Sequence, residues 1–125
     1  MRNILIAFLT ALMSVMNYSL GQDLNGIESA EYDAVNDRWL VSSSSGVLYT
    51  EDHGDTFHNF GMAQASHAME IVGGYIYTLD NNFIRAYSLE TAQLVGAHII
   101  PSAVFLNGMG SRANELVVSD FSSGK

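Results

Sequence analysis

The stretch Asp37-Arg38-Trp39-Leu40-Val41-Ser42-Ser43, followed after a short turn by Gly46-Val47-Leu48-Tyr49-Thr50, decides the expected fold of this chain. Short runs of aromatic, aliphatic and Thr residues bounded by Gly, Ser and Asp are typical of two strands joined as a hairpin. The same pattern returns at 74–87 and begins a third time at 115–120, at a spacing of roughly 36–41 residues. We therefore expect one β-unit to recur along the chain.

Two complete units and part of a third are expected. The strands of the first unit (26–61) are predicted at 27–32, 38–43, 47–51 and 57–60, and those of the second unit (67–100) at 68–72, 75–79, 83–88 and 93–99. The third unit (103–125) is expected to reach one strand, at 115–120. Because helical periodicity is absent after residue 21, the predicted fold class is all-β.

A four-stranded unit at this spacing is typical of a β-propeller blade, which needs neighbours to bury its apolar faces. The prediction is an incomplete β-propeller of about two and a half antiparallel blades. Such a number cannot close a ring, so we expect an N-terminal piece of a longer protein that is marginally stable and prone to associate in isolation. The alternative is a complete, small open-sheet protein.

The first 21 residues predict a helical signal peptide. A positive charge at Arg2 precedes an apolar run at 4–16, and Ser19 and Gly21 place small residues before an expected cleavage at Gln22. The run is shorter than the roughly 20 residues that a membrane span needs, so no stable span is expected. The prediction is a secreted or periplasmic domain at 22–125, and the alternative is a retained N-terminal anchor.

The charge of the chain restricts its partners. Five basic and 13 acidic residues give a net charge of −8, and removal of Arg2 with the leader leaves −9. Such a surface repels phosphate backbones, which argues against nucleic-acid binding. The chain has no Cys, so an exported domain would depend on packing rather than on disulfides.

The segment 50–57, Thr-Glu-Asp-His-Gly-Asp-Thr-Phe, is the sharpest local motif. An Asp in a tight turn accepts backbone N–H bonds, and a Gly permits a positive φ. The segment resembles the Asp box of sialidases and other secreted propellers, with Phe57 in place of the usual Trp. The resemblance implies a structural turn whose defining residues are Thr50, Asp52, Gly54, Thr56 and Phe57. The alternative is that Asp52 and Asp55 bind calcium or sugar.

A second resemblance covers most of 22–125. Residues 28–42 look like the opening blade of the senescence-marker-protein/gluconolactonase propellers, and 105–109 with 116–120 are similar to a later blade of that group and of NHL-type propellers. In lactonases of this group, an early Glu and an Asn of an Asn-Gly step help to hold a divalent metal. The resemblance implies Glu28 and Asn107 as ligands of a cation such as calcium, a Lewis acid for a lactone carbonyl.

The repeat itself suggests another alignment. Leu-Asn-Gly-Ile at 24–27 returns as Leu-Asn-Gly-Met at 106–109, and the two segments are expected at the same stage of their units. This echo pairs Asn107 with Asn25 rather than with Glu28, so the register of the metal ligands stays open.

Two classes of function remain. The first is an exported binding or scaffold module for an unidentified small molecule, glycan or protein, because propeller loops bind without catalytic groups. The second is a fragment of a metal-dependent lactonase-type hydrolase or of a sialidase-type hydrolase. A sialidase requires an arginine cluster for the substrate carboxylate, and only Arg38, Arg85 and Arg112 are available within 22–125. Catalytic residues are not identified.

Overall fold

The computed structural model describes residues 24–122, so the expected signal peptide at 1–21 lies outside the described residues. The described chain forms three antiparallel sheets that follow one another in sequence, and it contains no helix. In each sheet the strands lie in the order in which they occur along the chain. The all-β prediction is therefore confirmed.

The strands lie close to their predicted positions. The first sheet contains β1 (Ala30–Asp33), β2 (Arg38–Ser43), β3 (Gly46–Thr50) and β4 (His58–Asn59). The second sheet contains β5 (Met69–Val72), β6 (Tyr75–Asp80), β7 (Phe83–Ser88) and β8 (Leu94–Ile99). The third sheet contains β9 (Leu106–Arg112) and β10 (Glu115–Asp120).

The structure corrects three details of the sequence analysis. The third unit has two described strands rather than one. The first strand begins at Ala30 rather than at residue 27, because the N–H groups of Glu28 and Ser29 donate to a side chain, the Ser42 hydroxyl. The echoed segments also differ in position: 24–27 precedes β1, whereas 106–109 lies inside β9.

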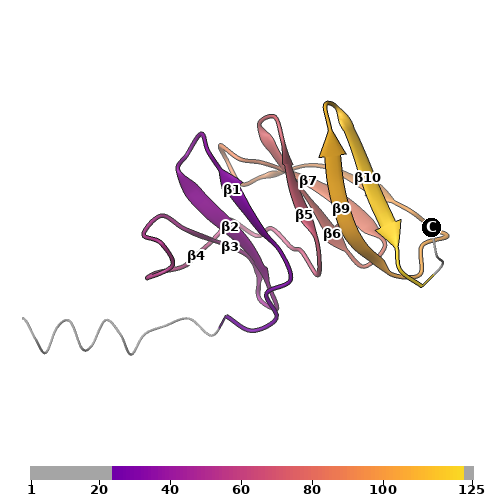
Figure 1. Cartoon of the computed structure of the whole chain (residues 1–125), viewed down its shortest axis with the longest axis horizontal. Coiled ribbons are helices and arrows are strands. Elements are labelled where there is room, and N and C mark those ends of the chain that lie inside the picture. The colour runs from indigo at the N-terminus through magenta and orange to yellow at the C-terminus, as the bar shows by residue number, and fades with distance from the viewer. Residues whose placement is uncertain (1–23, 123–125) are drawn as a thin grey trace, which may run out of the picture.

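The sheets stack face to face, and their first strands, β1, β5 and β9, lie side by side (Figure 1). Side chains alternate between the two faces of a strand, so Leu40 and its cross-strand neighbour Tyr49 point toward the second sheet. The core between the first two sheets consists of Leu40, Val47, Phe60, Ala63, Ala65, Met69, Ile76, Tyr87 and Leu89. Burial of a large apolar side chain stabilises a fold by about 1.5–3 kcal/mol.

Polar contacts join the neighbouring first strands. The N–H of Met69 in β5 donates to the Ser29 hydroxyl just before β1, over 3.2 Å. The Ser111 hydroxyl in β9 donates to the Glu70 carboxylate in β5, over 2.5 Å. Burial, together with the nearby charge of Glu70, raises the pKa of the Glu31 carboxyl. The seam between the sheets is thus apolar at its centre and polar along the first strands.

Candidate functional site

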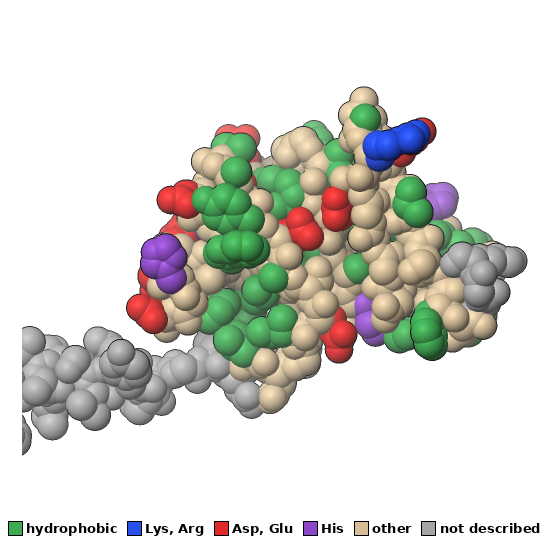
Figure 2. All heavy atoms as spheres, viewed as in Figure 1, with side chains coloured by type: hydrophobic (Ala, Val, Ile, Leu, Met, Phe, Trp, Pro, Cys, Tyr) green, Lys and Arg blue, Asp and Glu red, His purple; other side chains and the backbone are tan. Residues whose placement is uncertain are grey.

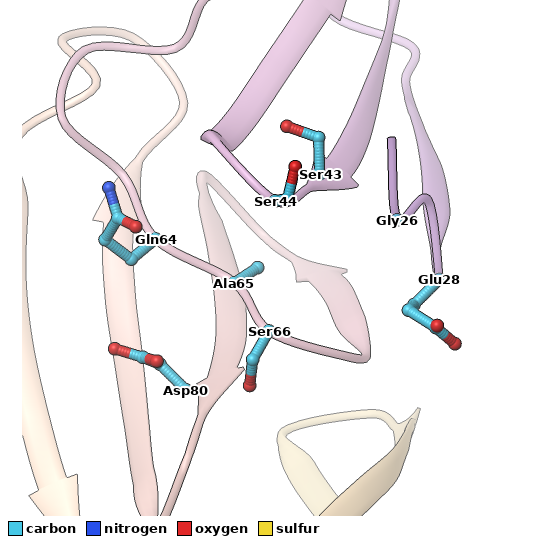
Figure 3. A pocket seen from close by; sticks show the side chains of 8 residues that line it. All are labelled: Gly26, Glu28, Ser43, Ser44, Gln64, Ala65, Ser66 and Asp80. Carbon is cyan, nitrogen blue, oxygen red and sulfur yellow. The ribbon is translucent and has the colours of Figure 1, made fainter. Parts of the chain in front are cut away.

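A hollow of about 340 Å³ lies where β2 turns into β3, next to the connection between the first two sheets. Its lining residues are Gly26, Glu28, Ser43, Ser44, Gln64, Ala65, Ser66 and Asp80. In Figure 3, Glu28 lies on one side of the hollow and Gln64 and Asp80 on the other, with Ala65 and Ser66 between them. The hollow is therefore built by both sheets and by the segment that joins them.

The turn between β2 and β3 is fixed by hydroxyl groups and by one glycine. The Ser43 hydroxyl donates to the Gly46 carbonyl over 2.8 Å and lies 3.0 Å from the Ser45 hydroxyl. Gly46 has a φ of +121°, and a Cβ atom there would lie 2.8 Å from the Ala63 carbonyl oxygen. Only glycine allows this close approach of the turn to the connecting segment, which determines the shape of the hollow.

Two polar residues of the hollow already have partners. The Ser66 hydroxyl accepts the N–H of Asn81 over 3.3 Å and donates to the Leu79 carbonyl over 3.2 Å. Asp80 forms an ion pair with Arg85 and accepts a hydrogen bond from the Asn81 side chain over 3.1 Å. These groups hold the second sheet in place at the hollow.

Three other polar groups of the hollow have no partner. Within residues 24–122, the Glu28 carboxylate, the Ser44 hydroxyl and the Gln64 side-chain amide form no hydrogen bond or ion pair. Glu28 is held through its backbone N–H, and Gln64 through its N–H to the Tyr87 hydroxyl over 3.2 Å. The backbone of these residues is therefore fixed while their polar side chains have no partner, and such an arrangement can receive a polar ligand.

The two residues implied as metal ligands lie in different places. Glu28 lines the hollow, whereas Asn107 is an exposed residue of β9 and is not part of the lining. Asn107 lies at the irregularity where β10 pairs with Gly108 through Ser119 and with Leu106 through Asp120. Within residues 24–122, no three His, Asp or Glu side chains form a group that could hold a metal ion.

The residues of the predicted Asp box form the turn between β3 and β4, at the other end of β3 from the hollow. The Asp52 carboxylate accepts hydrogen bonds from the Thr50 hydroxyl over 2.8 Å and from the Thr56 N–H over 2.9 Å. It also accepts one from the Thr56 hydroxyl over 2.5 Å. These hydrogen bonds, with the Thr56 side chain contributing most, lower the pKa of Asp52 to about 2.

The remaining residues complete this turn. The N–H of Gly54 donates to the Thr50 hydroxyl over 3.0 Å, and Gly54 has a φ of +94°. The ring of the half-buried Phe57 lies 3.8 Å from where a Cβ of Gly54 would be. Because both carboxylate oxygens of Asp52 bond to residues of the turn itself, the turn stabilises its own conformation.

The sequence analysis missed a second aspartate turn, at the junction of β1 and β2. Asp33 is 1% exposed and accepts hydrogen bonds from the Asn36 side-chain amide over 2.7 Å and from Arg38 Nε over 3.0 Å. Burial alone would raise the pKa of Asp33, but the hydrogen bonds from Asn36 and Arg38 outweigh it and lower the pKa. The sequence Asp-x-x-Asn-x-Arg at 33–38 could have indicated this turn, because it places a turn-forming Asn and a positively charged Arg within reach of one aspartate.

Each arginine in the described residues has its own carboxylate partner. The three pairs are Arg38 with Asp33, Arg85 with Asp80, and Arg112 with Glu115. Arg38 also donates to the Leu89 carbonyl over 2.5 Å, which ties the first sheet to the second. The arginines therefore lie apart, and the structure does not bring them together as a carboxylate-binding cluster.

No family model, curated protein or solved structure matches the chain. Among residues 24–122, no helix is long and apolar enough to cross a membrane.

Proposed function

We propose that the chain is an exported segment of a β-propeller and acts as a binding or scaffold module. Three observations support the propeller: successive antiparallel sheets, strands in sequential order within each sheet, and first strands that lie side by side. A stack of this kind continues naturally into a ring of sheets.

The hollow is the observation that carries the binding role. Turns and connections on a rigid scaffold are the usual place for ligand recognition. Around the hollow, a carboxylate, a hydroxyl and a side-chain amide offer both hydrogen-bond donors and acceptors. This chemistry suits a neutral or cationic polar ligand, such as a small hydroxylated molecule, a glycan or a polar protein segment.

An NMR titration tests this role. Millimolar glucose, galactose or N-acetylglucosamine is added to the ¹⁵N-labelled chain, and the amide shifts are followed. We expect saturable shifts at Ser44, Gln64 and Ser66 with at least one sugar. Gln64→Ala should abolish these shifts. The matched change Gln93→Ala, at an exposed position just before β8, should leave them in place. Absence of saturable shifts at the hollow with all three sugars would contradict glycan binding there.

A metal-dependent lactonase-type hydrolase is the second candidate, and the position of Glu28 in the hollow favours it. A free carboxylate is a ligand of the kind that calcium prefers. Calcium titration should then shift the amide signals around Glu28 in the wild type but not in Glu28→Gln, and Glu90→Gln serves as the control at an exposed site. An identical calcium response in wild type and Glu28→Gln would contradict this candidate. The sialidase-type alternative has less support, because each arginine is paired elsewhere.

The export part of the proposal has its own test. The chain expressed in a bacterial host should be recovered from the periplasm or medium with Gln22 as its first residue, as measured by mass spectrometry of the intact protein. Recovery of the protein with residues 1–21 still attached would favour the retained anchor.

A further inference from the structure

The outer face of the first sheet, which points away from the second sheet, is apolar. Because side chains alternate along each strand, Ala30, Tyr32, Trp39 and Val41 lie on this face, opposite to Leu40. The side chains of Tyr32 and Trp39 are 44% and 45% exposed, and their ring centroids lie 5.2 Å apart. Figure 2 shows hydrophobic side chains gathered over the first sheet. A shallow depression of about 320 Å³ on this face is lined by Ala30, Trp39, Val41, Thr50, His53, Gly54 and Phe57.

The third sheet also has an open face, at the other end of the stack. Ser111 of β9 contacts Glu70 of the second sheet, so the alternate positions Gly108 and Gly110 lie on the outer face. Their cross-strand partners there are Ser119 and Val117, and Val117 is 67% exposed. A Cβ atom added at Gly110 would meet no atom of residues 24–122 within 4 Å, so the described residues leave the middle of this face uncovered.

The internal interfaces show which kinds of face pack together. The face of the first sheet that carries Leu40 covers the face of the second sheet that carries Met69 and Ile76. The opposite face of the second sheet, which carries Glu70 and the fully buried Leu79, meets the third sheet. We call the face of a sheet that points toward the next sheet along the chain its forward face, and the opposite face its rear face. Both junctions therefore join the forward face of one sheet to the rear face of the next. Among residues 24–122, no sheet stacks on the rear face of the first sheet or on the forward face of the third, so one face of each kind is left.

We propose that a second copy of this chain docks here, with the forward face of its third sheet on the rear face of the first sheet. The bulky rings of Tyr32 and Trp39 would lie against the small residues Gly108 and Gly110. Arg112 and Glu115 also lie on the forward face, where they form an ion pair with each other and so add no net charge to it. A chain with a net charge of −8 can therefore approach another copy at these surfaces. This contact extends the stacking already present within the chain.

The proposed contact is heterologous, because two different surfaces meet. Such contacts generate rings or open chains rather than closed two-fold dimers. The association should therefore grow with concentration, and each open chain of subunits should keep one free face of each kind, at its two ends, until a ring closes.

Two variants test the geometry. Trp39→Glu charges the rear face and Val117→Glu charges the forward face, at positions that are 45% and 67% exposed. In a solution of one variant, every copy has the same intact face, and no copy has an intact face of the other kind to pair with it. We expect sedimentation velocity to show assembly for the wild type, and a monomer for each variant at concentrations at least about tenfold above those at which the wild type assembles.

Mixing the two variants gives the decisive measurement. Trp39→Glu retains the forward face and Val117→Glu retains the rear face, so an equimolar mixture should form a dimer and stop there. Val35→Glu, in an 88% exposed position in the turn between β1 and β2, is the control and should assemble like the wild type. The dimer in the mixture also shows that both variants are folded. If circular dichroism shows that Trp39→Glu is unfolded, Tyr32→Glu is used in its place.

Several results would overturn the proposal. A monomeric wild type at all concentrations would show that the open faces do not pair. Assembly of Val117→Glu alone would show that two first sheets meet each other. Assembly of both variants would place the contact elsewhere, for example at the exposed edge strand β8, and monomers in the mixture of folded variants would exclude the pairing of the two faces.

Discussion

The turn between β3 and β4 and the turn between β7 and β8 occupy the same place in successive sheets but are held by different forces. In the first, the Asp52 carboxylate is the acceptor for two threonines of the turn. In the second, Leu89 is 5% exposed, belongs to the core between the sheets, and accepts a hydrogen bond from Arg38 through its carbonyl. The turn after β7 thus adds the burial of Leu89 to its own backbone hydrogen bonds, such as the one from the Ala92 N–H to the Ser88 carbonyl over 2.8 Å. The turn after β3 depends instead on side-chain hydrogen bonds to Asp52.

This difference explains why only one of the two turns was conspicuous in the sequence. Local hydrogen bonding requires particular residues at fixed spacing, such as Asp52, Gly54 and Thr56. Burial requires only an apolar residue that reaches the core, and Leu89 in a polar segment is one such residue. Four substitutions, two in each turn, would separate the two forms of stabilisation.

Leu89→Ala should have the largest effect. Removal of a buried leucine side chain leaves a cavity between the first two sheets, and such changes cost about 2–5 kcal/mol of unfolding free energy. Urea unfolding followed by circular dichroism measures the loss. Leu94→Ala, at a position that is 54% exposed in β8, is the matched control and should change the midpoint little. Equal losses in the two variants would contradict the role of burial in this turn.

Gly54→Ala should have the next largest effect. The φ of +94° is unfavourable for any residue with a Cβ atom, and left-handed backbone costs about 1–2 kcal/mol for an L-residue. The same change at Gly96 in β8, where an added Cβ meets no atom within 4 Å, should shift the unfolding free energy by less than about 0.5 kcal/mol. A Gly54→Ala protein as stable as the wild type would show that the turn adapts without strain.

Asp52→Asn should lower the melting temperature by an amount that depends on pH. The pKa of Asp52 is lowered from 3.8 to about 2, so the ionised carboxylate stabilises the folded chain above about pH 4. This contribution is lost as the pH falls through about 2. The difference in melting temperature between wild type and variant should therefore be largest near neutral pH and shrink between pH 4 and pH 2. A difference that stays constant over this interval would show that the charge of Asp52 has no role.

Thr91→Ala should have the smallest effect. Its hydroxyl accepts one long hydrogen bond, from the N–H of Gln93 over 3.4 Å, in an exposed part of the turn. We expect a change below about 0.5 kcal/mol. Thr56→Ala, which removes a hydroxyl bonded to Asp52, should destabilise the chain more. Similar losses in both variants would remove the distinction between the two turns.

Much of the fold could be predicted from the sequence, because strand and turn signals are local. The alternation in 38–50 predicted β2 and β3 to within one residue at each end. The third sheet was harder: its first strand contains Asn107, Gly108 and Gly110, which have low β propensity. Its pairing with β10 provides the hydrogen bonds that single-strand propensity does not reveal.

The candidate site was predictable only in part. Glu28 was singled out and does line the hollow, but its implied partner Asn107 does not. Gln64 and Ser44 carry no recognisable motif, and they reach the same hollow from different segments because the connection after the first sheet packs against the turn after β2. Such a meeting depends on contacts between segments far apart in sequence.

The sequence by itself determined the strand pattern, the sequential pairing and the conformation of the Asp52 turn, since each depends on residues within one hairpin. The tertiary structure alone decided which face of each sheet is covered, that Asp33 is buried with Arg38, and where free polar groups surround a hollow. These properties arise from the stacking of whole sheets. The stacking energy is the sum of many weak apolar contacts, and no single sequence motif supplies it.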